Sequence, residues 1–358
     1  MSITSLKLKH FRCFKTAKLD FSESINFFYG RNGSGKTSIL EAIYLCSTGR
    51  SFKTPNTKQC IKKNAEDFII SSTLSDGSIL EIKKNINNSI QLLINSAKAN
   101  SIDLFRRMPS TQLDNKTFSL FSESPSYRRK IMDRALIAAK KEYSANFFRY
   151  NKVLSQRNNA LKNTHLPDLD TWDQLLVQAA ADICKERNNF FELLTNEFYL
   201  MSKLLDGADC YKIVKDISIE LHSGWKKTQD FRSALFEGRQ RDLRTKTSNI
   251  GPHRSDIKFF FCDDDVKNRL SRGEQKLVAI VWCAAINKTI TKHYNSSPIL
   301  IIDDLGSELD EVFYNELLKF LSLSENQLFF SNISDVFNSK IVNSDLISQK
   351  FHVEQFSK

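Results

Sequence analysis

The sequence predicts an α/β fold that is interrupted by an inserted helical lobe. Two observations predict the α/β part. A glycine-rich loop lies between an apolar strand and a helix within residues 25–46, and an apolar strand at residues 299–302 ends in two aspartates. Helical periodicity from residue 127 onwards predicts the lobe. With 358 residues, the chain is long enough to bury a large core and to form two lobes.

The N-terminal part is predicted to consist of strands with one helix between them. Alternating or continuous apolar residues predict three strands, a helix and a hairpin meander, at Leu6–Leu8, Leu19–Phe21, Ile25–Tyr29, Thr37–Cys46 and 68–95. Asp76-Gly77 and Asn87-Asn88 interrupt the meander, as turn residues do between hairpin strands.

The insert has apolar residues at helical spacing in two stretches. Residues 127–163 are predicted as one long helix, and a second helical stretch extends from Trp172 to Phe190. The segment 163–170 between them is predicted as a linker, in which Asp170 is placed to cap the second helix. Two long helices with a short link form an antiparallel pair.

The rest of the chain is predicted to return to strands and a final α/β segment. Strands are expected at Tyr211–Leu221 and Asp256–Cys262, and the α/β segment extends from Ser297 to the end. The predicted division is therefore a head of residues 1–126 and 206–358 and a helical lobe of residues 127–205.

Composition narrows the class of protein. Lys and Arg number 52 and Asp and Glu number 41, so the formal net charge is +11, which favours a polyanionic partner such as nucleic acid or an acidic membrane surface. Seven cysteines without a CxxC pair argue against a disulfide framework or a zinc ribbon. The absence of a long apolar segment predicts a soluble cytoplasmic protein with no membrane partner.

The segment Gly30–Thr37, GRNGSGKT, matches the phosphate-loop pattern G-x-x-x-x-G-K-[ST]. Glycines let backbone N–H groups close around phosphates, and the following helix N-terminus adds positive potential. Lys36 is expected to reach the β and γ phosphates of ATP, and Thr37 to hold Mg²⁺. The predicted nucleotide-binding residues of this segment are Gly30, Arg31, Asn32, Gly33, Ser34, Gly35, Lys36, Thr37 and Ser38.

Asp303 and Asp304 follow the apolar strand at residues 299–302. A buried parallel strand that ends in carboxylates places them at the edge of the sheet where ligands bind. Asp303 is expected to bind Mg²⁺, and Asp304 to orient or deprotonate the attacking water. Together with Lys36, Asp304 is the predicted catalytic pair.

Leu270–Lys276, LSRGEQK, precedes a long apolar run. Ser271 and Gly273 at the start of a helix can bind a terminal phosphate. Ser271 can equally be a simple helix cap, and in isolation that interpretation is favoured. The presence of two other nucleotide motifs favours the phosphate interpretation.

These three motifs resemble those of ABC-type ATPase heads, and within them the RecF family, over the whole length of the chain. The residues that carry the resemblance are Phe11-Arg12, residues 30–45, Gly49–Phe52, Ser124–Arg129, Gly251–Asp256, Leu270–Lys276 and residues 301–310. The short helical insert is similar to that of RecF proteins, whereas SMC and Rad50-like heads carry a very long coiled coil there.

The resemblance implies roles for further residues. Ser271 and Gly273 of one subunit would close over the nucleotide of the other, and Gln112 would be the Q-loop glutamine. Ser307–Asp310 would be the D-loop, and Ser331 or Asn332 would occupy the switch position. Asp114-Asn115-Lys116 stands where relatives commonly carry Pro-Glu.

A run of basic residues marks the first inserted helix. Residues 127–163 hold ten bases and two acids, a balance of +8. A solvated helix face is the ordinary explanation, but so uneven a ratio favours contact with DNA. The predicted DNA-binding residues are Arg50, Lys53, Arg128, Arg129, Lys140, Lys141, Arg149 and Lys152.

The resemblance implies an ATP-dependent DNA-binding protein of recombinational gap repair. ATP would dimerise two heads around gapped, duplex or single-stranded DNA, and slow, DNA-stimulated hydrolysis would release them. RecO and RecR would be partners in loading RecA. The alternatives are an SMC/Rad50-like, motor or transport ATPase acting elsewhere, and a nucleotide-gated DNA-binding module that does not hydrolyse ATP significantly. Asp304 in place of the more common catalytic Glu keeps the last one open.

Overall fold

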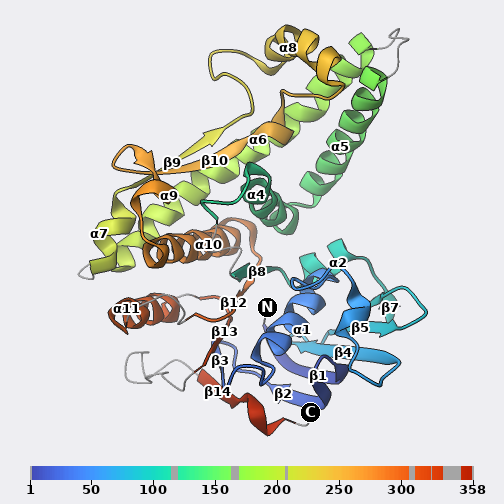
Figure 1. Cartoon of the computed structure of the whole chain (residues 1–358), viewed down its shortest axis with the longest axis vertical. Coiled ribbons are helices and arrows are strands. Elements are labelled where there is room, and N and C mark those ends of the chain that lie inside the picture. Colours follow the sequence, from blue (N-terminus) through green and yellow to red (C-terminus); the bar gives the residue numbers. More distant parts are fainter. Residues whose placement is uncertain are drawn as a thin grey trace.

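The computed structural model describes residues 2–113, 120–162, 169–205, 209–305, 311–323, 325–333 and 348–356, with no side chains for residues 209–211. Two lobes are visible in Figure 1. The lower lobe holds both ends of the described chain, a parallel sheet and an antiparallel sheet, and the upper lobe is mainly helical.

A five-stranded parallel sheet is the centre of the lower lobe. Its strand order is β14-β3-β13-β12-β8, and every neighbouring pair is parallel. The strands are β3 (Ile25–Tyr29), β8 (Ser110–Leu113), β12 (Ile299–Ile302), β13 (Leu328–Asn332) and β14 (Ser348–His352). Because all strands point the same way, the residues that follow β3, β12 and β13 meet at one edge of the sheet.

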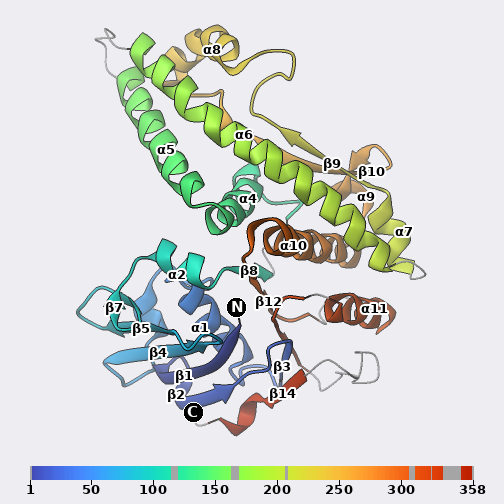
Figure 2. The ribbon, with the colours of Figure 1, turned by 180° about the vertical axis from the view of Figure 1, so that it is seen from behind.

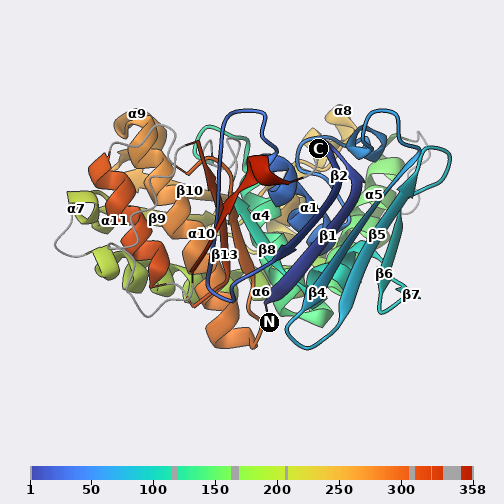
Figure 3. The same ribbon diagram turned by 90° about the horizontal axis from the view of Figure 1, so that it is seen from below.

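The side chains of this sheet alternate between two cores. Phe27 and Ile302 belong to a core shared with α10 (Arg272–Tyr294) and α11 (Glu311–Ser322). Phe28 and Ile301 belong to a second core shared with α1 (Lys36–Thr48) and the antiparallel sheet. Figure 3 shows the result, with α10 and α11 on one face of the parallel sheet and α1 on the other. Burial on both faces explains why β12 is a continuous apolar run and why β3 is apolar except for Asn26, whose amide donates to the carbonyl of Ser22.

The antiparallel sheet has the order β2-β1-β4-β5-β6-β7. Its strands are β1 (Ile3–Phe11), β2 (Phe14–Asp20), β4 (Asp67–Leu74), β5 (Ile79–Asn85), β6 (Gln91–Ile94) and β7 (Ala97–Lys98). The predicted meander over residues 68–95 is confirmed, and Gly77 takes a positive φ of 80° in its first turn. The short η1 (Thr57–Cys60) precedes β4, and α2 (Ser101–Arg107) follows β7.

The upper lobe contains more of the chain than the predicted range 127–205. Helices α4 (Pro125–Ala139), α5 (Lys141–Lys162) and α6 (Leu169–Ser202) pack with elements that come much later, and α5 and α6 form the expected antiparallel pair (Figure 2). Within the predicted range, η2 (Lys203–Leu205) follows α6 directly. The later elements are α7 (Asp209–Lys215), β9 (Ile217–His222), α8 (Phe231–Thr245), η3 (Pro252–Arg254), β10 (Asp256–Phe261), β11 (Asp264–Asp265) and α9 (Val266–Arg269).

The prediction of one helix over residues 127–163 is wrong. Lys140 has an extended backbone, with φ −129° and ψ 123°, and separates α4 from α5. Its side chain leaves the helix line to pair with Glu186 of α6 and to lie over the ring of Tyr294 of α10. Tertiary contacts therefore break a stretch that contains neither Gly nor Pro.

Two smaller predictions also need correction. Asp170 lies inside the first turn of α6 rather than before it, and its carboxylate pairs with Arg239. The expected strand Tyr211–Leu221 begins only at Ile217, because residues 209–215 form α7. The linker residues 163–168 lie outside the described residues.

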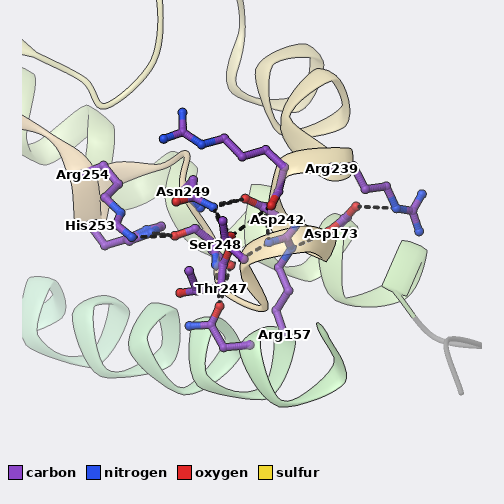
Figure 4. A network of polar contacts seen from close by, with 12 residues as sticks. Arg157, Asp173, Arg239, Asp242, Thr247, Ser248, Asn249, His253 and Arg254 are labelled. Carbon is purple, nitrogen blue, oxygen red and sulfur yellow. Dashed lines mark hydrogen bonds and ion pairs between the residues drawn. The ribbon is translucent and has the colours of Figure 1, made fainter. Parts of the chain in front are cut away.

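A buried polar network ties the loop of residues 246–249 to α5 and α6 (Figure 4). The fully buried guanidinium of Arg157 donates to Asp242 at 2.7 Å, to Ser248 at 2.6 Å and to Asp173 at 2.6 Å. Asp242 in turn accepts the backbone N–H of Asn249 at 2.9 Å. The lobe is therefore joined internally by charges as well as by apolar packing.

Candidate nucleotide-binding site

The phosphate loop lies between β3 and α1 and depends on glycine at several positions. Gly30, Gly33 and Gly35 have φ values of 142°, 79° and 113°. At Gly35 a Cβ atom would stand 2.6 Å from Cζ of Phe14 and 2.8 Å from Sγ of Cys13. Glycine is therefore required there both by backbone conformation and by space.

Lys36 folds back over the loop from the first position of α1. Its Nζ donates to the carbonyl oxygen of Gly30 at 2.5 Å and to that of Arg31 at 3.0 Å. Burial lowers the pKa of Lys36, while the carboxylates of Asp304, Asp303 and Glu354 act in the opposite direction. The ammonium group therefore lies within the loop, where phosphate charge would be received.

Asp303 is at the edge of the sheet, next to the start of α1. Its Oδ1 accepts the hydroxyl of Thr37 at 3.1 Å and that of Ser331 at 2.8 Å. Burial raises the pKa of Asp303, and these two hydroxyl groups favour the carboxylate. The structure thus brings together a carboxylate and a hydroxyl that were predicted from motifs 266 positions apart.

Oxygen ligands of this kind fit Mg²⁺. The ion commonly binds to one or two protein oxygens together with substrate phosphates and water. No group of three or more His, Cys, Asp or Glu side chains able to hold a metal occurs in the described part of the chain. Thr37 and Asp303 would therefore hold the ion jointly with a nucleotide.

Asp304 has an unusual backbone for a non-glycine residue, with φ 57°. Its N–H donates to Oγ of Ser331 at 2.9 Å, and its carbonyl oxygen accepts Nζ of Lys276 at 3.0 Å. Lys276 is fully buried and comes from α10. These two hydrogen bonds hold the left-handed conformation that turns Asp304 into the pocket.

These residues line a pocket of about 370 Å³ beside the phosphate loop. Its lining is Cys13, Asn32, Gly33, Gly35, Lys36, Thr37, Ser38, Lys53, Asp303, Asp304, Ser331 and Ile333. Lys53, which we predicted to contact DNA, is part of this pocket, and its charge favours the carboxylate form of Asp303. Lys53 is therefore better placed to meet nucleotide.

Ser331 and Asn332, which the sequence left as alternatives, are separated by the alternation of β13. Ser331 lines the pocket and bonds to Asp303, whereas Asn332 donates to the hydroxyl of Tyr314 at 3.3 Å. Ser331 therefore has the position expected of a residue that senses the nucleotide. The predicted D-loop, Ser307–Asp310, and the departure at residues 114–116 lie outside the described residues.

Ser271 and Gly273 do not line this pocket. Ser271 is the N-cap of α10 and forms a capping box, in which its hydroxyl accepts the N–H of Glu274 at 3.3 Å and Glu274 accepts the N–H of Ser271 at 2.7 Å. Ser271 thus caps α10, which is compatible with either interpretation, and neither Ser271 nor Gly273 is placed to contact a nucleotide in the pocket of its own chain.

Gln112 and Arg50 lie together in a different cavity. Gln112 pairs with Ile301 across β8 and β12, and both it and Arg50 line a cavity of about 510 Å³ that also has walls from α4 and α10. Neither residue lines the pocket at the phosphate loop. Gln112 therefore lies on the strand next to Asp303, whose N–H donates to the carbonyl of Leu113 at 3.0 Å, but it is not part of the pocket at the phosphate loop.

Much of the predicted basic surface is used inside the protein. Arg128 forms a two-pronged ion pair with Asp256 and also donates to two backbone carbonyls. Arg129 donates to the carbonyl of Ser255, and Lys140 pairs with Glu186. Arg128, Arg129 and Lys140 are thus already engaged by partners within the chain, which argues against them as DNA ligands.

Three of the predicted bases remain exposed on α5. Lys141, Arg149 and Lys152 fall within about 80° of one another on a helix. Phe148, with 52% of its surface exposed, lies on the same side. We call Lys141, Phe148, Arg149 and Lys152 the α5 basic face.

Glu354 and Lys276 are contacts of the site that sequence reasoning missed. Glu354 accepts the backbone N–H of Arg31 at 2.9 Å from 323 positions away. Lys276 was seen only as part of the motif at residues 270–276. No local pattern reveals either role, because each depends on how distant segments pack.

The fold and the site together define an ABC-type ATPase head. The RecF/RecN/SMC N-terminal domain family matches residues 2–349. The DNA replication and repair protein RecF of Pseudoalteromonas translucida is 32% identical, with 99% of this chain and 98% of that protein covered. The protein of the same name from Lachnoclostridium phytofermentans is 34% identical, with 89% of each chain covered. The chain belongs to the RecF family.

Solved structures agree with this fold. The recombination mediator protein RecF-ATPrS in the RecFOR pathway is similar at a TM-score of 0.79 and 26% identity, with 99% of this chain and 97% of that one covered. An SMC head bound to the C-terminal winged-helix domain of ScpA has a TM-score of 0.57 at 15% identity, and this likeness concerns the fold alone.

Two further features concern the whole described part of the chain. No helix among them is long and apolar enough to cross a membrane. Every cysteine whose side chain is described is a free thiol.

Proposed function

We propose that this protein is an ATP-dependent DNA-binding protein of recombinational gap repair. The observation that carries the proposal is the pocket in which Lys36, Thr37 and Asp303 converge beside a glycine loop. Lys36 is placed to contact the β and γ phosphates, and Thr37 and Asp303 are the residues that would hold Mg²⁺. The ATP-bound relatives and their name as DNA replication and repair proteins support this assignment.

The chemistry we propose is phosphoryl transfer to water. Asp304 accepts a proton from the attacking water. Ser331 senses the γ phosphate, and its hydrogen bond to Asp303 couples the two residues. When bound, Mg²⁺ would supply positive charge that stabilises the negative charge developing on the phosphates, and Thr37 and Asp303 would hold it. Hydrolysis sets how long the ATP-bound state lasts. Turnover is slow and is stimulated by DNA.

We further propose that ATP joins two copies of the chain. Ser271 and Gly273 are at a helix N-terminus outside their own pocket, which suits contact with a phosphate held by another subunit. The dimer closes around DNA and opens after hydrolysis. By analogy with its relatives, the protein acts with RecO and RecR to load RecA on gapped DNA.

The DNA surface we propose is the α5 basic face. Lys141, Arg149 and Lys152 are exposed, and no described ion pair engages them, so they can neutralise phosphates. Phe148 adds an exposed ring that can stack on an unpaired base, which suits single-stranded DNA at a gap. Arg50 is exposed as well and stays a second candidate.

DNA binding measured with ATP, with ADP and without nucleotide tests the function. We expect tight binding only with ATP. In Lys36→Ala, loss of a charge-assisted contact should weaken ATP binding by roughly 10- to 150-fold and abolish the ATP effect on DNA binding. The thermal unfolding midpoint of the variant checks that the fold is intact.

Other results would favour the alternatives. A protein that hydrolyses ATP but binds no DNA at physiological salt would be a plain ATPase. A protein that binds DNA under ATP control without any hydrolysis would be a nucleotide-gated binding module. If Lys36→Ala binds ATP like the parent chain, the assignment of the phosphate loop is wrong.

A further inference from the structure

The C-terminal segment reaches the phosphate loop from the far end of the chain. Glu354 lies in η4 (Val353–Gln355), directly after β14. One of its carboxylate oxygens accepts the backbone N–H of Arg31, the second residue of the loop, at 2.9 Å. The same oxygen would be 3.6 Å from a Cβ atom on Gly30, so it lies against the first turn of the loop.

Regular strand pairing between β14 and β3 determines the position of the Glu354 carboxylate. Strand β14 runs parallel to β3, beside which it lies in Figure 2, with His352 opposite Tyr29. The rings of His352 and Tyr29 stack with centroids 5.1 Å apart and planes 10° from parallel. The residues that follow β14, Glu354 among them, therefore lie beside the phosphate loop that follows β3.

The position of Glu354 distinguishes it from residues that touch nucleotide. It is not among the residues that line the pocket, so a bound phosphate need not displace it. Gly30, just before the bonded peptide, has a φ of 142° that only glycine adopts readily. A loop with this conformational freedom loses entropy when nucleotide binding orders it. A hydrogen bond that already orders the loop before nucleotide binds reduces this entropic cost of binding.

We propose that Glu354 is a positioning residue for the nucleotide: it holds the first peptide of the phosphate loop in its binding conformation, so that affinity depends on the C-terminal segment. This inference rests on the proposed function. Because Glu354 bonds to the peptide of the loop and does not line the pocket, it acts on the loop rather than on a phosphate, and the effect is expected for both ATP and ADP.

The test compares three variants of the full chain by calorimetric titration with ATP and with ADP. Glu354→Ala removes the acceptor, Glu354→Gln keeps an oxygen acceptor without the charge, and Gln355→Ala is an exposed neighbour on the same turn. We expect Glu354→Ala to weaken both nucleotides about three- to tenfold. Glu354→Gln should bind at least as well as the parent, since a negative charge near Lys36 is lost.

Amide exchange of residues 30–35 without nucleotide supplies a second reading. It should quicken in Glu354→Ala and stay at the parental rate in Glu354→Gln and Gln355→Ala. The inference is overturned if Glu354→Ala binds nucleotide like Gln355→Ala, or if Glu354→Gln is impaired as much as Glu354→Ala. Failure of the parent chain itself to bind ATP would instead reject the proposed function.

Discussion

Asp304, the residue that we propose accepts the proton of the attacking water, has a backbone conformation that few residues other than glycine adopt. Asn tolerates a φ of 57° better than most side chains, so Asp304→Asn should keep the local structure. An amide cannot accept the proton of the attacking water, so hydrolysis should slow by about 10²-fold or more. Single-turnover hydrolysis and an ATP titration measure the two properties separately. Loss of ATP binding, or an unchanged rate, would contradict the role of Asp304.

Ser271 has two candidate roles that one pair of substitutions can separate. Ser271→Arg removes the cap of α10 and obstructs a phosphate, whereas Ser271→Asp keeps a good cap but repels a phosphate. If Ser271 contacts the nucleotide of another subunit, both variants should bind ATP as monomers in sedimentation, and only Ser271→Arg should lose stability, by about 1 kcal/mol. Normal ATP-dependent dimerisation of Ser271→Asp would leave Ser271 as a cap alone.

At the scale of single elements, the sequence predicts those features of the structure that depend on residues close together in the chain. The phosphate loop, the strand before it and the aspartates after β12 are all local patterns, and they were placed correctly. The break at Lys140 was missed because Glu186 and Tyr294, which hold that residue, are 46 and 154 positions away in sequence. Helix periodicity carries no information about such partners.

Helix α5 shows how a buried charge differs from an exposed one on the same element. Removing Arg157 leaves the fully buried carboxylate of Asp242 without its cation, so Arg157→Ala should cost about 3–5 kcal/mol of unfolding free energy. Arg149→Ala on the exposed side of the same helix is the control and should change it by less than about 0.5 kcal/mol. Urea unfolding followed by circular dichroism measures both, and equal effects would mean that the network does not stabilise the lobe.

At the scale of the whole molecule, the charge available on a surface depends on which residues are neighbours in the folded protein, and not only on which are neighbours in sequence. The ten bases of residues 127–163 suggested a broad DNA surface, yet Arg128, Lys140 and Arg157 are paired with acids from other segments. Their partners Asp256, Glu186 and Asp242 lie outside the stretch over which the charge was summed. What is left for a polyanion is narrower, and the part of it that we propose for DNA is the α5 basic face, in the upper lobe (Figure 1).

This narrower surface gives a quantitative prediction for DNA binding. Each lysine or arginine that neutralises a phosphate releases counterions, so log K falls with log salt by about 0.9 per contact on duplex DNA. Replacing Lys141, Arg149 and Lys152 by Gln keeps helix propensity high and should reduce that slope by up to about 2.7 if all three touch phosphate. ATP binding should not change, because none of the three lines the nucleotide pocket.

A matched variant separates contact from long-range attraction. Lys7, Lys9 and Lys15 are exposed on the antiparallel sheet, and replacing them by Gln removes the same charge from the lower lobe. Binding to gapped DNA is measured with ATP over a series of salt concentrations for both triple variants and the parent chain. If the α5 basic face touches DNA, only its variant reduces the slope, while the control lowers affinity slightly through the net field. Equal slopes in the two variants would move the DNA site off α5, and Arg50 would then be the next residue to replace.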